Sequence, residues 1–166
     1  MRKLLDCNIG PECHVWAWLN RAQEPRTLNQ ETGPYVMIKS IDHIVLTASD
    51  IKRTAAFYCD ALGMELQQFT PPDGSADRLT LVFGQQKINL HDAAAPFSPH
   101  ARIPTAGALD LCFLSDVGLA DWIAHLAAHG IAIEQGPIRR TGATGPINSI
   151  YVRDPDGNLV EIANPV

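Results

Sequence analysis

Four side chains that commonly bind metal ions, His43, His91, Asp110 and Glu161, recur at matched positions of an internal repeat. His43 and Asp110 lie in the first predicted strand of each copy. His91 and Glu161 lie in the last, 48 (91 − 43) and 51 (161 − 110) residues later. Two imidazoles and two carboxylates suit Zn, Ni, Co, Mn or Fe(II). The set therefore predicts one divalent ion without selecting the metal.

Burial supports this prediction, because an ionised carboxylate among apolar residues is costly unless it is paired or bound to a metal. Asp110 and Glu161 both have apolar sequence neighbours. A single strand histidine is more often a packed residue than a ligand, so the prediction rests on the matched positions. It requires that the four side chains meet at one point in a concave pocket.

The predicted strands and helices that must position these residues occur in two similar copies along the chain. Each copy has a branched, apolar strand, then a helix that ends at a glycine 20 residues after the strand begins (63 − 43 and 130 − 110). Asp50 and Asp116 are predicted to cap the two helices by accepting the free N–H groups of the first turn. Gly63 and Gly130 are predicted to end them in the left-handed conformation.

Three further strands follow in each copy, near residues 64–70, 78–84 and 86–92, then 131–135, 148–153 and 158–163. A proline-containing connector at 93–108 joins the copies. We therefore expect an α+β fold of two βαβββ modules, 38–92 and 108–164. They should form a cupped mixed sheet with helices on the outside and a ligand cavity on the concave side.

The first 36 residues lack helical or strand periodicity, and Met37 directly precedes the first strand. We expect 1–36 to be an irregular N-terminal extension of a domain at 37–166. The net charge is −5 and no basic block is present, which argues against nucleic acid as a partner. No apolar run reaches 18 residues, so no membrane span is expected. Cys59 and Cys112 lie in apolar runs and are expected to be buried free thiols in the reducing cytoplasm.

Two segments carry a family resemblance. Residues 41–69 contain Asp42-His43-Ile44-Val45-Leu46, Phe57-Tyr58 and Leu62-Gly63-Met64. Residues 153–162 read Arg153-Asp154-Pro155-Asp156-Gly157-Asn158-Leu159-Val160-Glu161-Ile162. Over about residues 38–164 the chain resembles the vicinal-oxygen-chelate superfamily, which includes glyoxalases, bleomycin-resistance proteins and extradiol dioxygenases. Through Lys87-Ile88-Asn89-Leu90-His91 it is most similar to glyoxalase-domain proteins of poorly assigned substrate.

The resemblance implies an enzyme of the glyoxalase I type, a metal-dependent lyase or isomerase related to lactoylglutathione lyase. The ion would bind two adjacent substrate oxygens and stabilise an enediolate. Glu161 would be both ligand and catalytic base. His91 stands where glyoxalase I members carry a glutamate, and Asp110 where they carry a histidine. The resemblance also implies a homodimer, with the site inside one chain or shared between two.

Other functions stay open. His43, His91 and Glu161 have the composition of the Fe(II) site of an extradiol ring-cleavage dioxygenase. A non-catalytic drug-binding module would lack the metal set. A thiol transferase acting on an epoxide antibiotic would need a basic cluster for a phosphonate, and the sequence shows none. Candidate contacts to a small substrate with adjacent oxygens are Asn89, Tyr151 and Arg139.

Overall fold

The computed structural model describes residues 38–166, so the predicted extension at 1–36 and Met37 lie outside the described residues. The first module contains β1 (His43–Ala48), α1 (Ile51–Ala56), the π-helix η2 (Phe57–Ala61), β2 (Glu65–Phe69), β3 (Arg78–Phe83) and β4 (Gln86–Asp92). Its sheet has the order β1-β4-β3-β2, and β1 runs parallel to β4.

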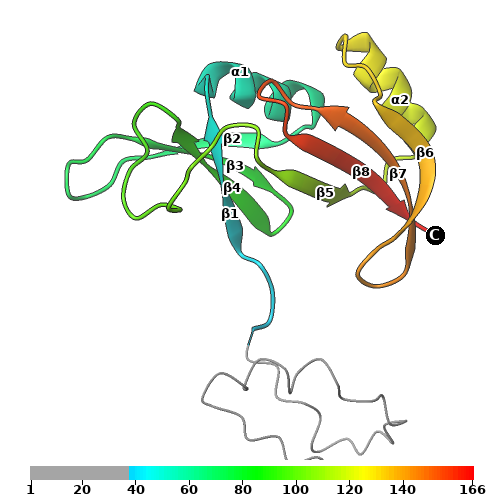
Figure 1. The fold of residues 1–166 in the computed structure, drawn as a ribbon, viewed down its shortest axis with the longest axis horizontal. Helices are drawn as coiled ribbons and strands as arrows, with labels where there is room; N and C mark the ends of the chain where they lie inside the picture. The colour runs from blue at the N-terminus through cyan, green and yellow to red at the C-terminus, as the bar shows by residue number, and fades with distance from the viewer. Residues whose placement is uncertain (1–37) are drawn as a thin grey trace, which may run out of the picture. The chain divides into compact units, whose positions relative to one another are not determined.

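The second module repeats this arrangement. It contains β5 (Asp110–Leu114), α2 (Leu119–Ala128), β6 (Gln135–Thr141), β7 (Pro146–Arg153) and β8 (Leu159–Pro165). Its sheet has the order β5-β8-β7-β6, with β5 parallel to β8. Figure 1 shows both helices on the same side of the strands. The predicted α+β fold of two βαβββ modules is confirmed, and each module builds its own mixed four-stranded sheet.

The helix boundaries were predicted unequally well. Asp50 caps α1 as expected, since its carboxylate accepts the N–H groups of Lys52 and Arg53. Asp116 does not cap α2, because that helix begins later and Gly118 is its N-cap residue. Gly63 and Gly130 follow the two helices with φ of 73° and 69°, as predicted.

The strand predicted at 131–135 is wrong. The chain there is irregular, and β6 begins only at Gln135. The register between β6 and β7 shifts between Gln135 and Ile138, where Gly136 has a φ of 110°. Arg139 and Arg140, which lie outside the predicted strands, are therefore in a strand, where neighbouring side chains point to opposite faces.

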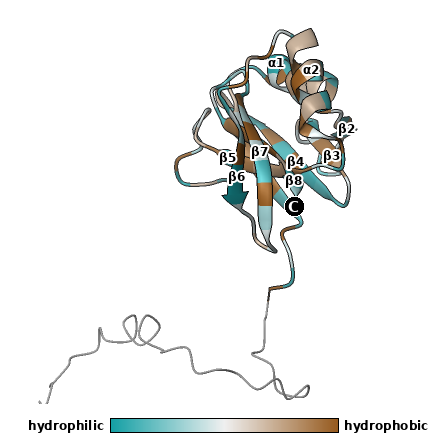
Figure 2. Ribbon diagram, turned by 90° about the vertical axis from the view of Figure 1, so that its right-hand side faces the viewer, coloured by the Kyte–Doolittle hydropathy of each residue, from teal (hydrophilic) through white to brown (hydrophobic). Residues whose placement is uncertain are grey.

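Alternation along the strands separates a helix-covered face from an open face in each sheet (Figure 2). On the covered face, Leu46, Leu81, Ile88, Ile150 and Val160 are fully buried. Residues of both modules share one apolar core. The two open faces are where the predicted site residues lie. Neither helix in residues 38–166 is long and apolar enough to span a membrane.

The turn at 154–158, between β7 and β8, forms hydrogen bonds with the first module. The buried Asp154 carboxylate accepts hydrogen bonds from the N–H groups of Asp156 and Asn158 and from the Asn158 amide. It also accepts one from the Tyr58 hydroxyl of the other module. Ser49, at the end of β1, donates its hydroxyl and N–H to the Asp156 carboxylate. The turn at 154–158 thus positions the two modules as well as the strand that carries Glu161.

Candidate functional site

His43 and His91 lie on the open face of the first sheet but too far apart to share an ion. His43 pairs with Lys87 across the parallel strands, and His91 lies four residues further along β4. Four residues of strand span about 13 Å, whereas a ligand nitrogen lies about 2 Å from a metal. The two histidines therefore cannot bind the same ion within one chain.

The register gives a different match between the modules. Asp110 pairs with Leu159, and Glu161 lies two residues beyond that partner. His43 pairs with Lys87, and the residue two beyond it is Asn89. Asn89, not His91, thus occupies the position of Glu161 in the first module. The sequence offsets of 48 and 51 hid this, because the intervening loops differ in length.

The four predicted ligands do not come together in one chain. In residues 38–166, no three His, Cys, Asp or Glu side chains lie close enough to hold a metal ion. His43 is exposed and bonds through Nδ1 to Asp42 Oδ1 at 2.7 Å. This bond lowers the pKa of the exposed Asp42 carboxyl. Asp110 is also exposed. The donor set does not fit an ion within the described part of a single chain.

Glu161 nevertheless lacks a partner that its burial calls for. It is half-buried on the open face of the second sheet, and its Oε1 is buried without a hydrogen-bond partner. A buried acceptor left unpaired costs about 1–3 kcal/mol. Cys112 pairs with it across β5 and β8. Burial of the thiol, followed by the nearby charge of Glu161, raises the pKa of Cys112 to about 11. Cys112 is exposed as a residue, contrary to prediction.

An organised polar group lies beside Glu161. Tyr151 pairs with Glu161 across β7 and β8. Arg140 donates from Nε to the Tyr151 hydroxyl at 3.1 Å and from an Nη to Gln135 Oε1 at 3.1 Å. No carboxylate of residues 38–166 forms an ion pair with this guanidinium. Arg139 is exposed and pairs with Asn148, so it faces away. Arg140 rather than Arg139 is the arginine of the open face, and strand alternation would have separated the two.

On the first sheet, Asn89 is half-buried and its Oδ1 accepts a hydrogen bond from the Thr80 hydroxyl at 3.2 Å. His91 is only 2% exposed, and its Nδ1 has no hydrogen-bond partner. Its ring packs against Phe97 with centroids 3.8 Å apart. Burial, together with the positive charges of His100 and Arg78, lowers the pKa of His91. His91 is thus a buried polar side chain under the connector, separate from His43.

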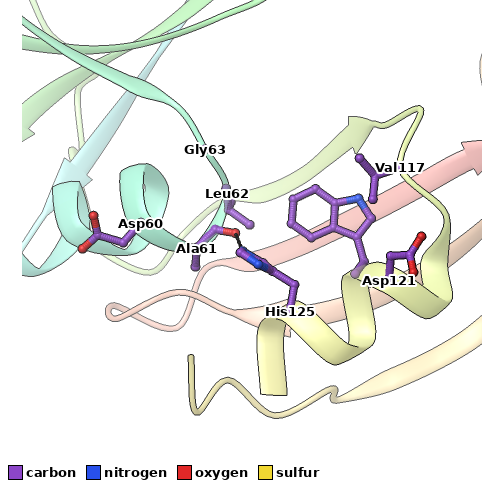
Figure 3. Close-up of a pocket in the computed structure, with 8 residues that line it drawn as sticks. Asp60, Ala61, Leu62, Gly63, Val117, Asp121 and His125 are labelled. Atoms are coloured by element: carbon purple, nitrogen blue, oxygen red, sulfur yellow. Dashed lines mark hydrogen bonds between the residues drawn. The ribbon is translucent and has the colours of Figure 1, made fainter. Parts of the chain in front are cut away.

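A cavity of about 460 Å³ lies on the helical side, away from both open faces. It is lined by the end of η2 and by Val117, Asp121, Trp122 and His125 (Figure 3). His125 Nε2 lies 3.0 Å from the Ala61 carbonyl oxygen across this cavity. The lining is mainly apolar and contains none of the predicted ligands.

Comparison with known proteins agrees with this architecture. Virulence protein STM3117 of Salmonella typhimurium is 47% identical over 131 residues, which is 79% of this chain and 88% of that protein. Its crystal structure superposes with a TM-score of 0.73 over 79% of this chain and all of that chain. The glyoxalase domain-containing protein RDO1 of Mycosarcoma maydis is 47% identical over 76% of this chain and 69% of its own length.

A more distant structure, lactoylglutathione lyase from Agrobacterium tumefaciens, is 28% identical. It covers 76% of this chain and 94% of its own, with a TM-score of 0.57. Residues 40–162 match the profile of one large superfamily. Together with the two βαβββ modules, these matches show that the chain belongs to the Glyoxalase/Bleomycin resistance protein/Dioxygenase superfamily.

Proposed function

We propose that the protein is a divalent-metal-dependent enzyme of the glyoxalase type whose site forms between two copies of the chain. The proposal rests mainly on Glu161, because its buried Oε1 has no hydrogen-bond partner among the described residues. Its position is matched in the other module by Asn89, and the position of Asp110 is matched by His43. The similarity to a lactoylglutathione lyase supports the reaction type.

The open faces have the composition expected of surfaces that meet a partner. Val45 on the first sheet is 42% exposed, and Leu114 on the second is 64% exposed. Both lie beside proposed ligands, since Val45 follows His43 on the same face and Leu114 pairs with Ala163, two residues beyond Glu161. Exposed apolar side chains rimmed by polar ones mark interaction surfaces. In a two-fold dimer each face is used twice, which gives two equal sites.

In this proposal His43, with the Asn89 amide oxygen beside it, meets the partner's Asp110 and the partner's Glu161. A bound divalent ion would act as a Lewis acid towards two adjacent substrate oxygens. Glu161 would accept a carbon-bound proton, which requires it to lie within about 3 Å of that proton's carbon or one water away. Tyr151 and Arg140 would donate hydrogen bonds to the same substrate. His91 is not part of this ligand set.

Subunit complementation tests the shared site directly. We expect His43→Ala and Glu161→Ala each to abolish ion binding, measured as metal per chain after purification without added metal. Mixing the two variants through unfolding, followed by refolding with the metal that the wild type holds, gives half heterodimers, and each contains one intact site. Metal content should then recover to about a quarter of the wild-type value.

A site inside one chain gives the opposite result. Every chain in the mixture then lacks one of the two ligands, so the metal content does not recover. Light scattering reports the dimer independently. Glu65→Gln is a matched control, since Glu65 is an exposed carboxylate on β2 that hydrogen-bonds only to Gln67. It should leave the metal content unchanged. Wild-type protein that binds no metal would favour the non-catalytic binding function instead.

A further inference from the structure

The connector between the modules covers one end of the first open face, and basic side chains gather there. Arg78 on β3 and His91 on β4 are neighbours across the antiparallel pair, since Leu79 pairs with Leu90. Phe97 of the connector touches both. Its ring lies 4.2 Å from the Arg78 guanidinium carbon and 3.8 Å from the His91 ring centroid.

Two nitrogen atoms beside Phe97 are buried without partners, namely Arg78 Nε and His91 Nδ1. Buried donors are rarely left unpaired, and each such case calls for a physical reason. Arg78 also forms no ion pair with any carboxylate of residues 38–166. An unpaired, partly buried guanidinium next to an imidazole is suited to an anionic group, because the guanidinium offers several N–H donors in fixed positions and the imidazole can offer one more.

A cavity of about 310 Å³ adjoins Arg78 and Phe97, which form its wall together with Leu79 and Leu90 of the helix-covered face. Asp77 and Asp92 also line it, and both already accept other hydrogen bonds. Asp77 accepts from the Gln68 amide, and Asp92 accepts from the N–H of Ala94. Neither carboxylate lies within ion-pair distance of Arg78, so neither occupies its N–H donors.

We propose that Arg78 and His91, held by Phe97, bind an anionic group of the substrate, such as a carboxylate or phosphonate. This inference rests on the proposed function for one point, that the reacting part of the same molecule lies at Asn89 and His43. Asn89 precedes His91 by two residues on the same face of β4. A molecule of a few carbon atoms can therefore reach from Asn89 to the anion site. The substrate class is then a small acid that carries two adjacent oxygens.

Equilibrium binding separates this role from simple packing. Phenylacetate and phenylacetamide have the same shape but differ in charge, and both can be titrated into the full chain by calorimetry. We expect the wild-type protein to bind phenylacetate at least tenfold more tightly than phenylacetamide. Arg78→Met, similar in length but uncharged, should remove the preference. Inorganic phosphate should compete with phenylacetate in the wild-type protein.

A control variant locates the effect. Arg139→Met removes an exposed guanidinium from the opposite side of the second sheet and should keep the preference. If Arg78→Met does not fold, judged by circular dichroism, Arg78→Lys replaces it. That variant keeps the charge but not Nε, and should weaken phenylacetate binding several-fold.

The inference is overturned by equal affinity for the two probes, by no phenylacetate binding at millimolar concentration, or by an unchanged preference in Arg78→Met. Loss of the preference in Arg139→Met also overturns it. These outcomes are independent of the complementation test. If metal content recovers in the mixed variants but no anion preference is found, only the anion site is excluded. If the anion preference is found but metal content does not recover, only the shared metal site is excluded.

Discussion

The Tyr58 hydroxyl of the first module donates a 3.2 Å hydrogen bond to Asp154 Oδ2 of the second. Both side chains are buried, with exposures of 0% and 5%. Burial, followed by the charge of Asp154 and the bond to it, raises the pKa of Tyr58 well above its ordinary value. The phenol therefore stays protonated and remains a donor across the pH range in which the protein is studied.

Replacing Tyr58 by Phe should destabilise the protein by about 1–3 kcal/mol, because a buried carboxylate loses a donor. Urea unfolding followed by circular dichroism measures the change. Tyr151→Phe is the matched control, since its half-buried hydroxyl accepts from Arg140 on an open face. Loss of the Tyr151 hydroxyl should lower the free energy of unfolding by less than loss of the Tyr58 hydroxyl. Equal costs in the two variants would show that the Tyr58 hydroxyl has no special part in joining the modules.

Glu161→Gln should reduce turnover by at least about 100-fold, the contribution expected of a positioned general base. Metal content should stay close to the wild-type level, because the amide oxygen still binds the ion. The readout is the rate of proton exchange at the reacting carbon of a substrate acid. Activity near the wild-type rate would exclude Glu161 as the base, and Glu65→Gln should remain fully active.

Arg140→Met should raise KM about 10- to 100-fold, the range expected for a hydrogen bond that involves a charged group. Arg139→Met should leave KM unchanged, since its side chain is exposed on the opposite side of β6. Steady-state kinetics on the same substrate compares the two variants. A larger effect from Arg139 would place the substrate on the other side of the sheet.

Gly136 sets the register that brings Arg140 to the open face. A Cβ at this position would lie 2.5 Å from the Ser149 carbonyl oxygen and 2.9 Å from Ile150 Cα, at a φ of 110°. Gly84 also has a positive φ, of 52°, but nothing lies within 4 Å of its added Cβ. Gly84→Ala should cost about 1 kcal/mol, and Gly136→Ala about 2 kcal/mol more. Equal unfolding midpoints would contradict this account of the bulge.

The exposed pair of Arg153 and Glu134 gives a pH-dependent contribution. A hydrogen bond from Arg153, at 2.6 Å, and its charge hold the pKa of Glu134 below its ordinary value of 4.5. A carboxyl whose folded pKa is lowered stabilises the protein above its unfolded pKa, and this is lost as pH falls through the folded pKa. Wild type and Glu134→Gln should differ slightly in urea midpoint at neutral pH and converge well below pH 4.5. A gap that widens on acidification would contradict the assignment.

The sequence was sufficient for most of the fold. Asp50, Gly63 and Gly130 act locally, so their capping and turn roles follow from residue type. The strand at β6 was missed because Gly136 and Pro137 interrupt the alternation with a bulge. Asp116 failed as a cap because the chain continues extended to Gly118 before the helix begins.

The site was less predictable, since it depends on register. Counting along the chain matched His91 to Glu161, whereas the strand pairing matches Asn89 to it. Local sequence does not specify which residues of parallel strands lie side by side. The basic cluster at Phe97 was also hidden, because Arg78, His91 and Phe97 are brought together by tertiary packing rather than by spacing.

The π-helix η2 tolerates no change in the number of its residues without a change in the contact that follows it. Its wide turn ends at Ala61, whose carbonyl oxygen lies against His125 of α2. A deletion of one residue within Phe57–Ala61 would favour an ordinary α-helix and rotate all that follows by about 100°. Relatives that differ in length at this segment would therefore need a different contact between their two helices.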